Sequence, residues 1–226
     1  MARRLDPFLE ELRQTLLRMG SLAEAILAKS LRAVWERDPR LAAEVRQDDL
    51  AIDRIDVAID QDATGALALQ TPVASDLRLV LAIRTMATDL ERVGDLARNI
   101  AGSAIRLAER PVVAIPPSLE ELADQATRAL GDALDSFSKS DAVRARAILA
   151  ADDDIDALED QLIRDAIAEA SGHPEITPQQ VDYILIAKSL ERVGDHATNI
   201  AEEVIFLTEA RILRHEAKLG GGQARG

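Results

Sequence analysis

The sequence predicts an all-α protein made of two tandem three-helix bundles, that is, six long antiparallel helices. Ala and Leu dominate a chain of 226 residues in which aromatic residues make up only 2%, a composition typical of helix bundles. Apolar residues recur at the spacing of one helix face, and no segment shows the sustained alternation of a strand. The peptide Leu-Glu-Arg-Val-Gly-Asp occurs at Leu90–Asp95 and again at Leu190–Asp195, which indicates a tandem duplication.

The first half should contain three helices. The first has an apolar face made of Leu9, Leu12, Leu16, Met19, Ala23 and Ile26. The second should begin after Asp38, an N-cap residue that is followed by proline at the first helical position. Pro72 and Ser75 precede the third. We expect these helices over residues 5–36, 39–68 and 75–109.

The second half should repeat this arrangement. Residues 111–117 form a proline-rich joint near the middle of the chain. Ser140 and Asp141 separate two helical stretches, and the segment 172–174, Gly-His-Pro, precedes the last helix. We expect helices over residues 118–139, 142–170 and 178–213. Because the turns within each half are short, neighbouring helices should run antiparallel.

The duplication extends beyond the repeated peptide. Four positions of the first half, Asp38, Asp49, Asp53 and Ile55, align without gaps to Asp141, Asp152, Asp156 and Leu158. The repeat is therefore three helices long. We expect a first repeat over residues 1–113, a second over 114–215 and a flexible, glycine-containing tail over 216–226.

Charge and composition narrow the possible functions. The net charge is −13, so nonspecific binding to nucleic acid is not expected, because phosphates would be repelled. There is no Cys, which excludes disulfides and thiolate metal sites. No apolar run reaches the length of a membrane span, and Arg3 and Arg4 are not followed by the apolar stretch of a signal peptide. We expect a cytoplasmic protein without direct membrane insertion.

The repeated peptides carry a polar stripe. Positions four apart lie on the same helix face, so Glu91, Asp95 and Asn99 should form one stripe, and Val93 and Ala97 should point toward the core. The second copy repeats the stripe with Glu191, Asp195 and Asn199. A duplicated stripe of this kind is a candidate functional surface.

The middle helix of each half carries a second acidic stripe. In the first half it consists of Asp49, Asp53, Asp56 and Asp60, and in the second half of Asp152, Asp156 and Glu159, with Ile163 at the fourth place. Like charges at this spacing repel each other by a few tenths of a kcal/mol per pair. Two facing acidic stripes would make a carboxylate-lined site for metal ions such as iron, zinc, manganese or magnesium.

Other interpretations of these residues stay open. Acidic residues on helix surfaces are usually only solvated, and Gly94 and Gly194 can reflect tight helix packing alone. Arg98 lies close to the first stripe where the second copy has Thr198, so it could neutralise the acids and lower metal occupancy in the first half. His196 points away from the stripe of its helix and is not counted as a ligand.

Signatures of enzymes are absent from the sequence. There is no Glu-x-x-His pair of di-iron proteins, no His-Glu-x-x-His, no phosphate-binding loop and no dinucleotide fingerprint. The serines lack the surroundings of a nucleophile elbow. We therefore expect a protein that is not an enzyme.

The paired Leu-Glu-Arg-Val-Gly-Asp motifs strongly resemble the two signature motifs of the PhoU family, the accessory and regulatory proteins of bacterial phosphate transport. Residues 72–78 resemble the segment that opens the third helix of that family, and residues 191–202 are very similar to its second signature. The resemblance extends to about His215. It implies two three-helix bundles, often in a homodimer, with a multinuclear metal cluster in each repeat.

The resemblance also implies ligands, partners and a role. The implied ligands are Asp49, Asp53, Glu91, Asp95, Asp152, Asp156, Glu191 and Asp195, with Asn99 and Asn199 as further candidates. The implied role is negative control of phosphate uptake and of the phosphate-starvation response. The implied partners are the ATPase subunit of the phosphate ABC transporter and a sensor histidine kinase. The alternatives are a metal-dependent hydrolase that uses the same acids and a plain helical scaffold.

Overall fold

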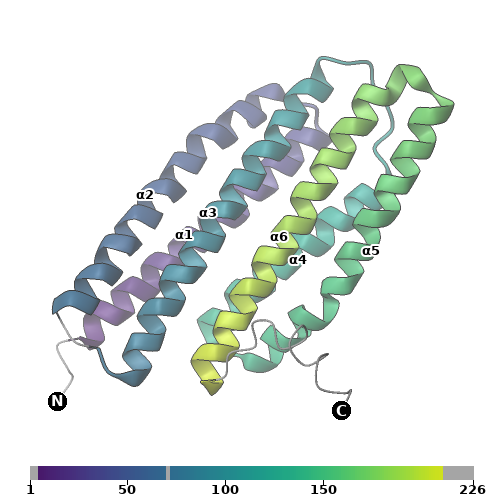
Figure 1. Cartoon of the computed structure of the whole chain (residues 1–226). Coiled ribbons are helices and arrows are strands. Elements are labelled where there is room, and N and C mark those ends of the chain that lie inside the picture. Colours follow the sequence, from purple (N-terminus) through teal and green to yellow (C-terminus); the bar gives the residue numbers. More distant parts are fainter. Residues whose placement is uncertain (1–4, 70–71, 211–226) are drawn as a thin grey trace, which may run out of the picture.

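The computed structural model describes residues 5–69 and 72–210, and the described chain is helical almost throughout. The first half contains α1 (Asp6–Trp35), α2 (Pro39–Leu69) and α3 (Ala74–Ala108). The second contains α4 (Pro117–Lys139), α5 (Ala142–Gly172) and α6 (Thr177–Glu209), with the short 3-10 helix η1 (Pro174–Ile176) before α6. The predicted fold class, all-α with two tandem three-helix bundles, is confirmed (Figure 1).

The predicted helix ends agree with the structure within about two residues, except at the end of α6. This helix ends at Glu209 rather than at residue 213, because Ala210 adopts a left-handed conformation with φ 55°. The predicted tail, residues 216–226, lies outside the described residues. No helix in the described part of the chain is both long and apolar enough to cross a membrane.

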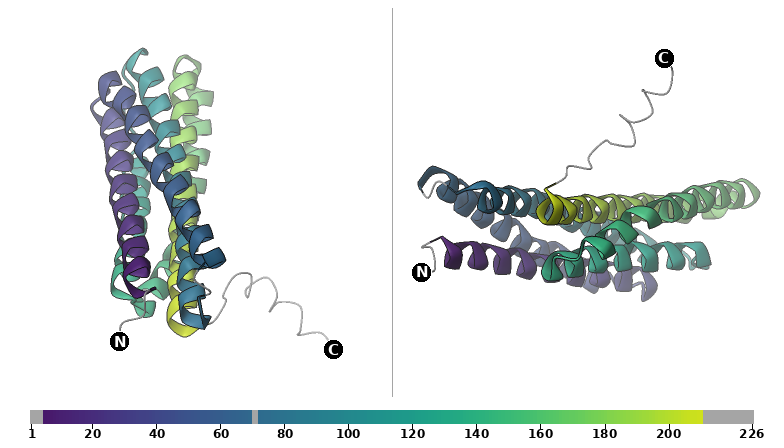
Figure 2. Two further views of the ribbon diagram at one scale, coloured as in Figure 1. Left: turned by 90° about the vertical axis from the view of Figure 1, so that its left-hand side faces the viewer. Right: turned by 90° about the horizontal axis from the view of Figure 1, so that it is seen from below.

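The six helices form two layers. In Figure 1, α2, α3, α6 and α5 lie side by side, and α1 and α4 lie behind them. The view from below in Figure 2 shows α1 and α4 covering one face of the other helices. Within each half all three helices contact one another, and the halves meet through α3 against α6 and α1 against α4.

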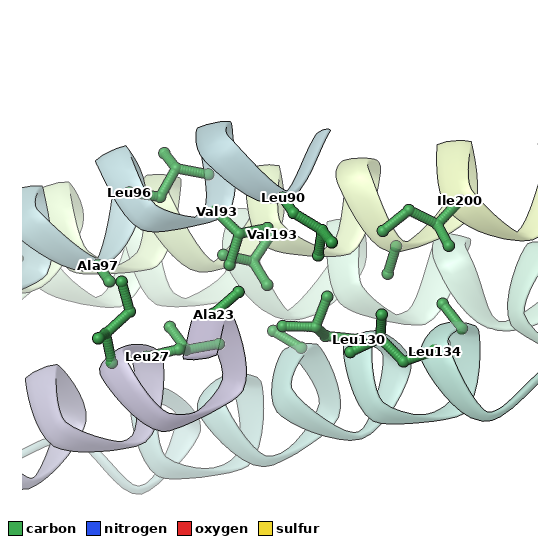
Figure 3. Packing of buried hydrophobic residues seen from close by; sticks show 14 of the residues in the cluster. Ala23, Leu27, Leu90, Val93, Leu96, Ala97, Leu130, Leu134, Val193 and Ile200 are labelled. Atoms are coloured by element: carbon green, nitrogen blue, oxygen red, sulfur yellow. The ribbon is translucent and has the colours of Figure 1, made fainter. Parts of the chain in front are cut away.

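One continuous apolar core joins the two halves. Figure 3 shows Leu27 of α1, Leu90 of α3, Leu130 of α4 and Val193 of α6 within the same buried apolar cluster. The apolar face expected for α1 is buried along its whole length. Because the core residues are mostly aliphatic, the low aromatic content is no obstacle to a well-packed bundle.

Helices α3 and α6 run antiparallel across the junction between the halves. Asp89 and His196 are in contact near the middle of both helices, with 2.8 Å between Oδ1 and Nδ1. Further along α3, the guanidinium of Arg106 lies 2.6 Å from Oδ1 of Asp182. Since the residue number rises along α3 while it falls along α6, the two copies of the repeated peptide are related by an approximate two-fold axis between these helices.

Candidate metal site between paired acidic helices

The predicted acidic stripes face each other within each half. Helix α2 packs against α3, and α5 packs against α6. Apolar residues on the core side of each helix, such as Ile52 of α2 and Val93 of α3, are buried. Their burial fixes how each helix is rotated about its own axis. Both glycines of the repeated peptides are buried at these contacts, as the packing interpretation requires. The carboxylates are thereby directed toward the seam between the paired helices.

In the first half, Asp49, Asp53, Asp56, Glu91 and Asp95 form what we call the first acidic face. Burial raises the pKa of Glu91, and the nearby charges of Asp95, Asp56 and Asp53 raise it further. Carboxylates of α2 and α3 are therefore close enough to repel each other. Asp60, the last acid of the predicted stripe, instead forms a 2.7 Å salt bridge with Arg84.

Arg98 provides a positive charge inside the first acidic face. Its guanidinium lies 2.9 Å from Oδ2 of Asp49 and 2.7 Å from Oδ1 of Asp95. Asp49 is 1% exposed, and its two oxygens have no well-aligned hydrogen-bond donor despite the ion pair. Burial raises the pKa of Asp49, and Arg98 opposes that increase. The arginine thus partly neutralises these two carboxylates.

Gly94 makes the burial of Asp49 possible. A Cβ atom added to Gly94 would stand 2.5 Å from Oδ1 of Asp49, so any larger residue would displace the carboxylate. The three atoms nearest to the equivalent Cβ on Gly194 all belong to Ile155, the first of them at 3.0 Å. The two glycines therefore have different neighbours, although both allow a close approach between helices.

In the second half, Asp152, Asp156, Glu159, Glu191 and Asp195 form the second acidic face. Burial, followed by the charges of Asp156 and Asp195, raises the pKa of Asp152 to about 6. Burial and the neighbouring acids, above all Asp195, raise the pKa of Glu191 to about 7. These carboxylates are close together and poorly neutralised.

The second acidic face contains little compensating positive charge. Within the described residues its only salt bridge joins Lys188 to Glu159, at 3.1 Å. Thr198 stands in the place of Arg98, and its hydroxyl donates to the backbone oxygen of Asp195 at 2.7 Å. A pocket of about 340 Å³ lies beside the second acidic face. Residues of α4, α5 and α6 line this pocket, and they include Asp152, Gly194 and Thr198. Arg128 and Arg144 also line this pocket, and Arg144 is paired with Asp135 at 2.5 Å.

The two predicted asparagine ligands do not join the acidic faces. Asn199 donates a 3.1 Å hydrogen bond to Asp89 of α3, the same carboxylate that contacts His196. Asn99 lies toward α6, in a groove between α3 and α6. We therefore restrict the candidate ligands to carboxylates. As expected from the sequence, His196 points away from the acids of its own helix.

The donors suit a hard or borderline cation, but they are not assembled around one point. Among residues 5–69 and 72–210, no three acidic or histidine side chains are grouped as the ligands of a single ion would be. The case for a cation therefore rests on the charge of the donor set, because a bound cation would relieve the repulsion between these carboxylates. By that criterion the second half suits a cation better than the first, which contains Arg98.

Some residues of the acidic faces were not among the predicted ligands. The pKa of Glu91 is raised in part by Asp56, and that of Glu191 in part by Glu159. Both acids belong to the predicted stripes on α2 and α5, three positions after Asp53 and Asp156. The helical spacing was the signal that could have included them.

A family model agrees with the duplication. The model of the PhoU domain matches the chain twice, over residues 16–104 and 119–204. A relative from Pseudomonas putida, named phosphate-specific transport system accessory protein PhoU homolog, is 37% identical over 212 residues, which are 92% of this chain and 81% of the relative. A relative of the same name from Caulobacter vibrioides is 35% identical over 204 residues, 89% of each chain.

Solved structures agree with the fold. The crystal structure of PhoU from Pseudomonas aeruginosa superposes with a TM-score of 0.90 at 33% identity, covering 92% of this chain and 100% of that one. The phosphate transport system regulatory protein PhoU from Streptococcus pneumoniae gives a TM-score of 0.86 at 30% identity, with 93% and 99% covered. With the family model matching both halves and relatives above 30% identity over most of their length, this chain belongs to the PhoU family.

Proposed function

We propose that this chain is a cytoplasmic, metal-binding negative regulator of phosphate uptake and of the phosphate-starvation response. Its relatives are named accessory proteins of phosphate-specific transport, which supports a role beside a phosphate transporter. In this proposal it acts as a homodimer that links the ATPase subunit of the phosphate ABC transporter to a sensor histidine kinase. It has no catalytic role of its own.

The observation that carries the metal part of the proposal is the second acidic face. Its carboxylates come from two helices, face one another and have raised pKa values at Asp152 and Glu191. Two such groups are costly to keep charged together unless a cation neutralises them. A divalent or trivalent ion such as iron, zinc, manganese or magnesium would supply that charge and accept oxygen ligands. The repetition of the arrangement in the first half allows a second, weaker site there.

Metal analysis of the purified full-length protein tests this part directly. We expect bound metal after purification without chelator, and a large loss of it in Asp156→Asn and Asp195→Asn. Asp160→Asn is a matched control, because Asp160 is an exposed acid of α5 outside the second acidic face. Metal at background level in the wild type, or equal metal in all three variants, would contradict the metal site.

The regulatory part needs a separate experiment. Deletion of the gene should raise expression of phosphate-responsive genes in phosphate-rich medium, and the protein should bind the transporter ATPase or the kinase in a pull-down. Light scattering should give the mass of a dimer. Unchanged expression after deletion would contradict the regulatory role without affecting the metal site. Turnover of a phosphate ester that Asp195→Asn abolishes would instead favour a hydrolase.

A further inference from the structure

A groove rich in positive charge lies between α3 and α6. It has a volume of about 820 Å³, and Arg46 of α2 contributes to its edge. Its charged lining residues are all basic, in a chain whose net charge is −13. They are Arg46, Arg98, Arg106, Lys188 and Arg192. The local charge of this groove is therefore opposite to that of the whole molecule.

The duplication explains why the space is open. Across the approximate two-fold axis, the contact between Asp89 and His196 corresponds to the pair Ser189 and Leu96. On the first side the two polar side chains, together with Asn199, are bonded to one another across the helices. On the second side Ser189 and Leu96 cannot form such a contact, and both line the groove. The divergence of the two copies thus leaves one side closed and the other open.

Polar donors line the groove between its charges. Asn99, Ser103 and Ser189 are on its wall, and Ser103 accepts a 2.8 Å hydrogen bond from Arg106. The amide of Asn99 and the hydroxyl of Ser103 can donate to an anionic oxygen, whereas the hydroxyl of Ser189 already donates to the backbone oxygen of Leu185 at 2.9 Å. Leu96 and Leu185 provide the apolar part of the lining.

The basic side chains differ in their partners. Arg98, Arg106 and Lys188 are each held by a carboxylate outside the groove lining, which fixes their positions. Arg46 and Arg192 are exposed, and neither forms a salt bridge within the described part of the chain. The groove thus combines three positioned cations with two that remain available for a ligand.

We propose that this groove binds a polyphosphate-class oxyanion, meaning a small anion that carries at least two linked phosphate groups. Arginine guanidiniums match phosphate oxygens with paired hydrogen bonds. The cations come from three helices, so a chain of phosphates can reach more of them than a single phosphate can. The volume is also in the range of pockets for ligands larger than one phosphate ion. The acidic remainder of the surface disfavours a long nucleic acid strand, which would extend beyond the groove.

Titration calorimetry of the full chain with tripolyphosphate, ATP and orthophosphate tests the proposal. EDTA in every sample prevents anions from binding through metal ions at the acidic faces, so the result is independent of the metal site. We expect saturable binding of tripolyphosphate that weakens with added salt, and weaker binding of orthophosphate. If ATP binds more tightly than tripolyphosphate, the natural ligand is a nucleotide. If ATP binds equally or more weakly, the natural ligand is an inorganic phosphate chain.

Two variants and one matched control decide where the anion binds. The double variant Arg46→Gln/Arg192→Gln should weaken binding about tenfold or more, since charge-assisted hydrogen bonds contribute about 1.5–3 kcal/mol each. Arg92→Gln should leave it unchanged, because Arg92 is the counterpart of Arg192 in the first copy and lies outside the groove. Circular dichroism checks that each variant is folded. The proposal is overturned by no saturable binding, by orthophosphate binding as tightly as tripolyphosphate, or by equal weakening in Arg92→Gln.

Discussion

At the scale of single residues, a few substitutions between the two copies decide how the halves differ. Arg98 and Thr198 are equivalent positions, yet one holds Asp49 and Asp95 while the other leaves a pocket beside Asp152. The difference between the two copies identified this position, and the pairing of Arg98 with acids of the first stripe agrees with the expected neutralisation, while its effect on metal binding stays a prediction. It could not show that Arg98 reaches both acids, because the reach of a side chain depends on helix rotation and separation.

Exchanging these two residues should redistribute bound metal. Arg98→Thr removes one of the two arginines paired with the first acidic face and leaves Arg92 beside Glu91 and Asp95, so we expect more metal bound per chain than in the wild type. Thr198→Arg places a guanidinium beside Asp152 and Asp195, so we expect less. Elemental analysis and calorimetric titration with the metal found in the wild type measure both. Unchanged metal content in both variants would mean that Arg98 does not compete with a cation.

Gly94 should be needed for the placement of Asp49. Gly94→Ala gains helix propensity of about 1 kcal/mol. Its Cβ, however, would stand 2.5 Å from Oδ1 of Asp49, so the carboxylate would have to move. We expect a net loss of about 1–3 kcal/mol in the free energy of unfolding, from the forced shift at a packed contact.

Gly65→Ala is the matched control for this experiment. Gly65 lies in α2 with no atom within 4 Å of an added Cβ, so the substitution should stabilise by about 0.5–1 kcal/mol. Urea unfolding of both variants gives the comparison. A stabilised Gly94→Ala would show that Asp49 can move without cost.

At the scale of helices, the sequence predicted most boundaries because the signals are local. Proline at the start of α2 and α4 and the capping residue of α5 mark helix ends through their own backbone chemistry. The end of α6 has no such marker, and there the prediction was too long. Which side of a helix meets the other half is not a local property, so the roles of Asn199 and His196 at the α3–α6 contact could not be predicted.

The N-cap of α5 should contribute measurably to stability. The Oδ1 atom of Asp141 accepts hydrogen bonds from the backbone N–H groups of Val143 and Arg144, both at 3.0 Å. Asp141→Ala removes this acceptor and should lower the free energy of unfolding by about 1 kcal/mol. Asp141→Asn keeps a side-chain oxygen and should lose much less. Equal losses in denaturant titrations of the two variants would show that the cap bond is not the source of the effect.

At the scale of the whole molecule, the duplication was visible in the sequence, but its consequence was not. Sequence patterns predicted two similar halves with similar acidic faces. The structure joins them through one core and an antiparallel α3–α6 contact, and this contact creates the basic groove. Arg46, Arg106 and Lys188 come from different helices and share no motif, so no spacing rule could bring them together before the halves were docked.

The acidic faces should make the stability of the metal-free protein depend on pH. In the folded chain the pKa of Asp152 is raised to about 6 and that of Glu191 to about 7, by burial first and then by neighbouring acids. In the unfolded chain these groups have pKa values of about 3.9 and 4.3. Between about pH 4 and 7 the folded state therefore binds more protons than the unfolded state, and the free energy of unfolding falls as the pH rises.

In EDTA we therefore expect the melting temperature to fall by a few degrees from pH 5 to pH 8, since 1 kcal/mol corresponds to about 2–4 °C for a chain of this size. Glu191→Gln removes one of the responsible carboxylates, so the melting temperature of this variant should fall less over the same pH range. All other titrating groups are the same in both proteins, so the difference between the two reports on Glu191. Added metal should raise the melting temperature of the wild type more at pH 8 than at pH 5, because a cation binds the deprotonated carboxylates. A melting temperature that rises with pH in EDTA, or that falls equally in Glu191→Gln, would show that repulsion between the carboxylates of the second acidic face does not destabilise the folded protein. The same carboxylates would then need no cation to neutralise them.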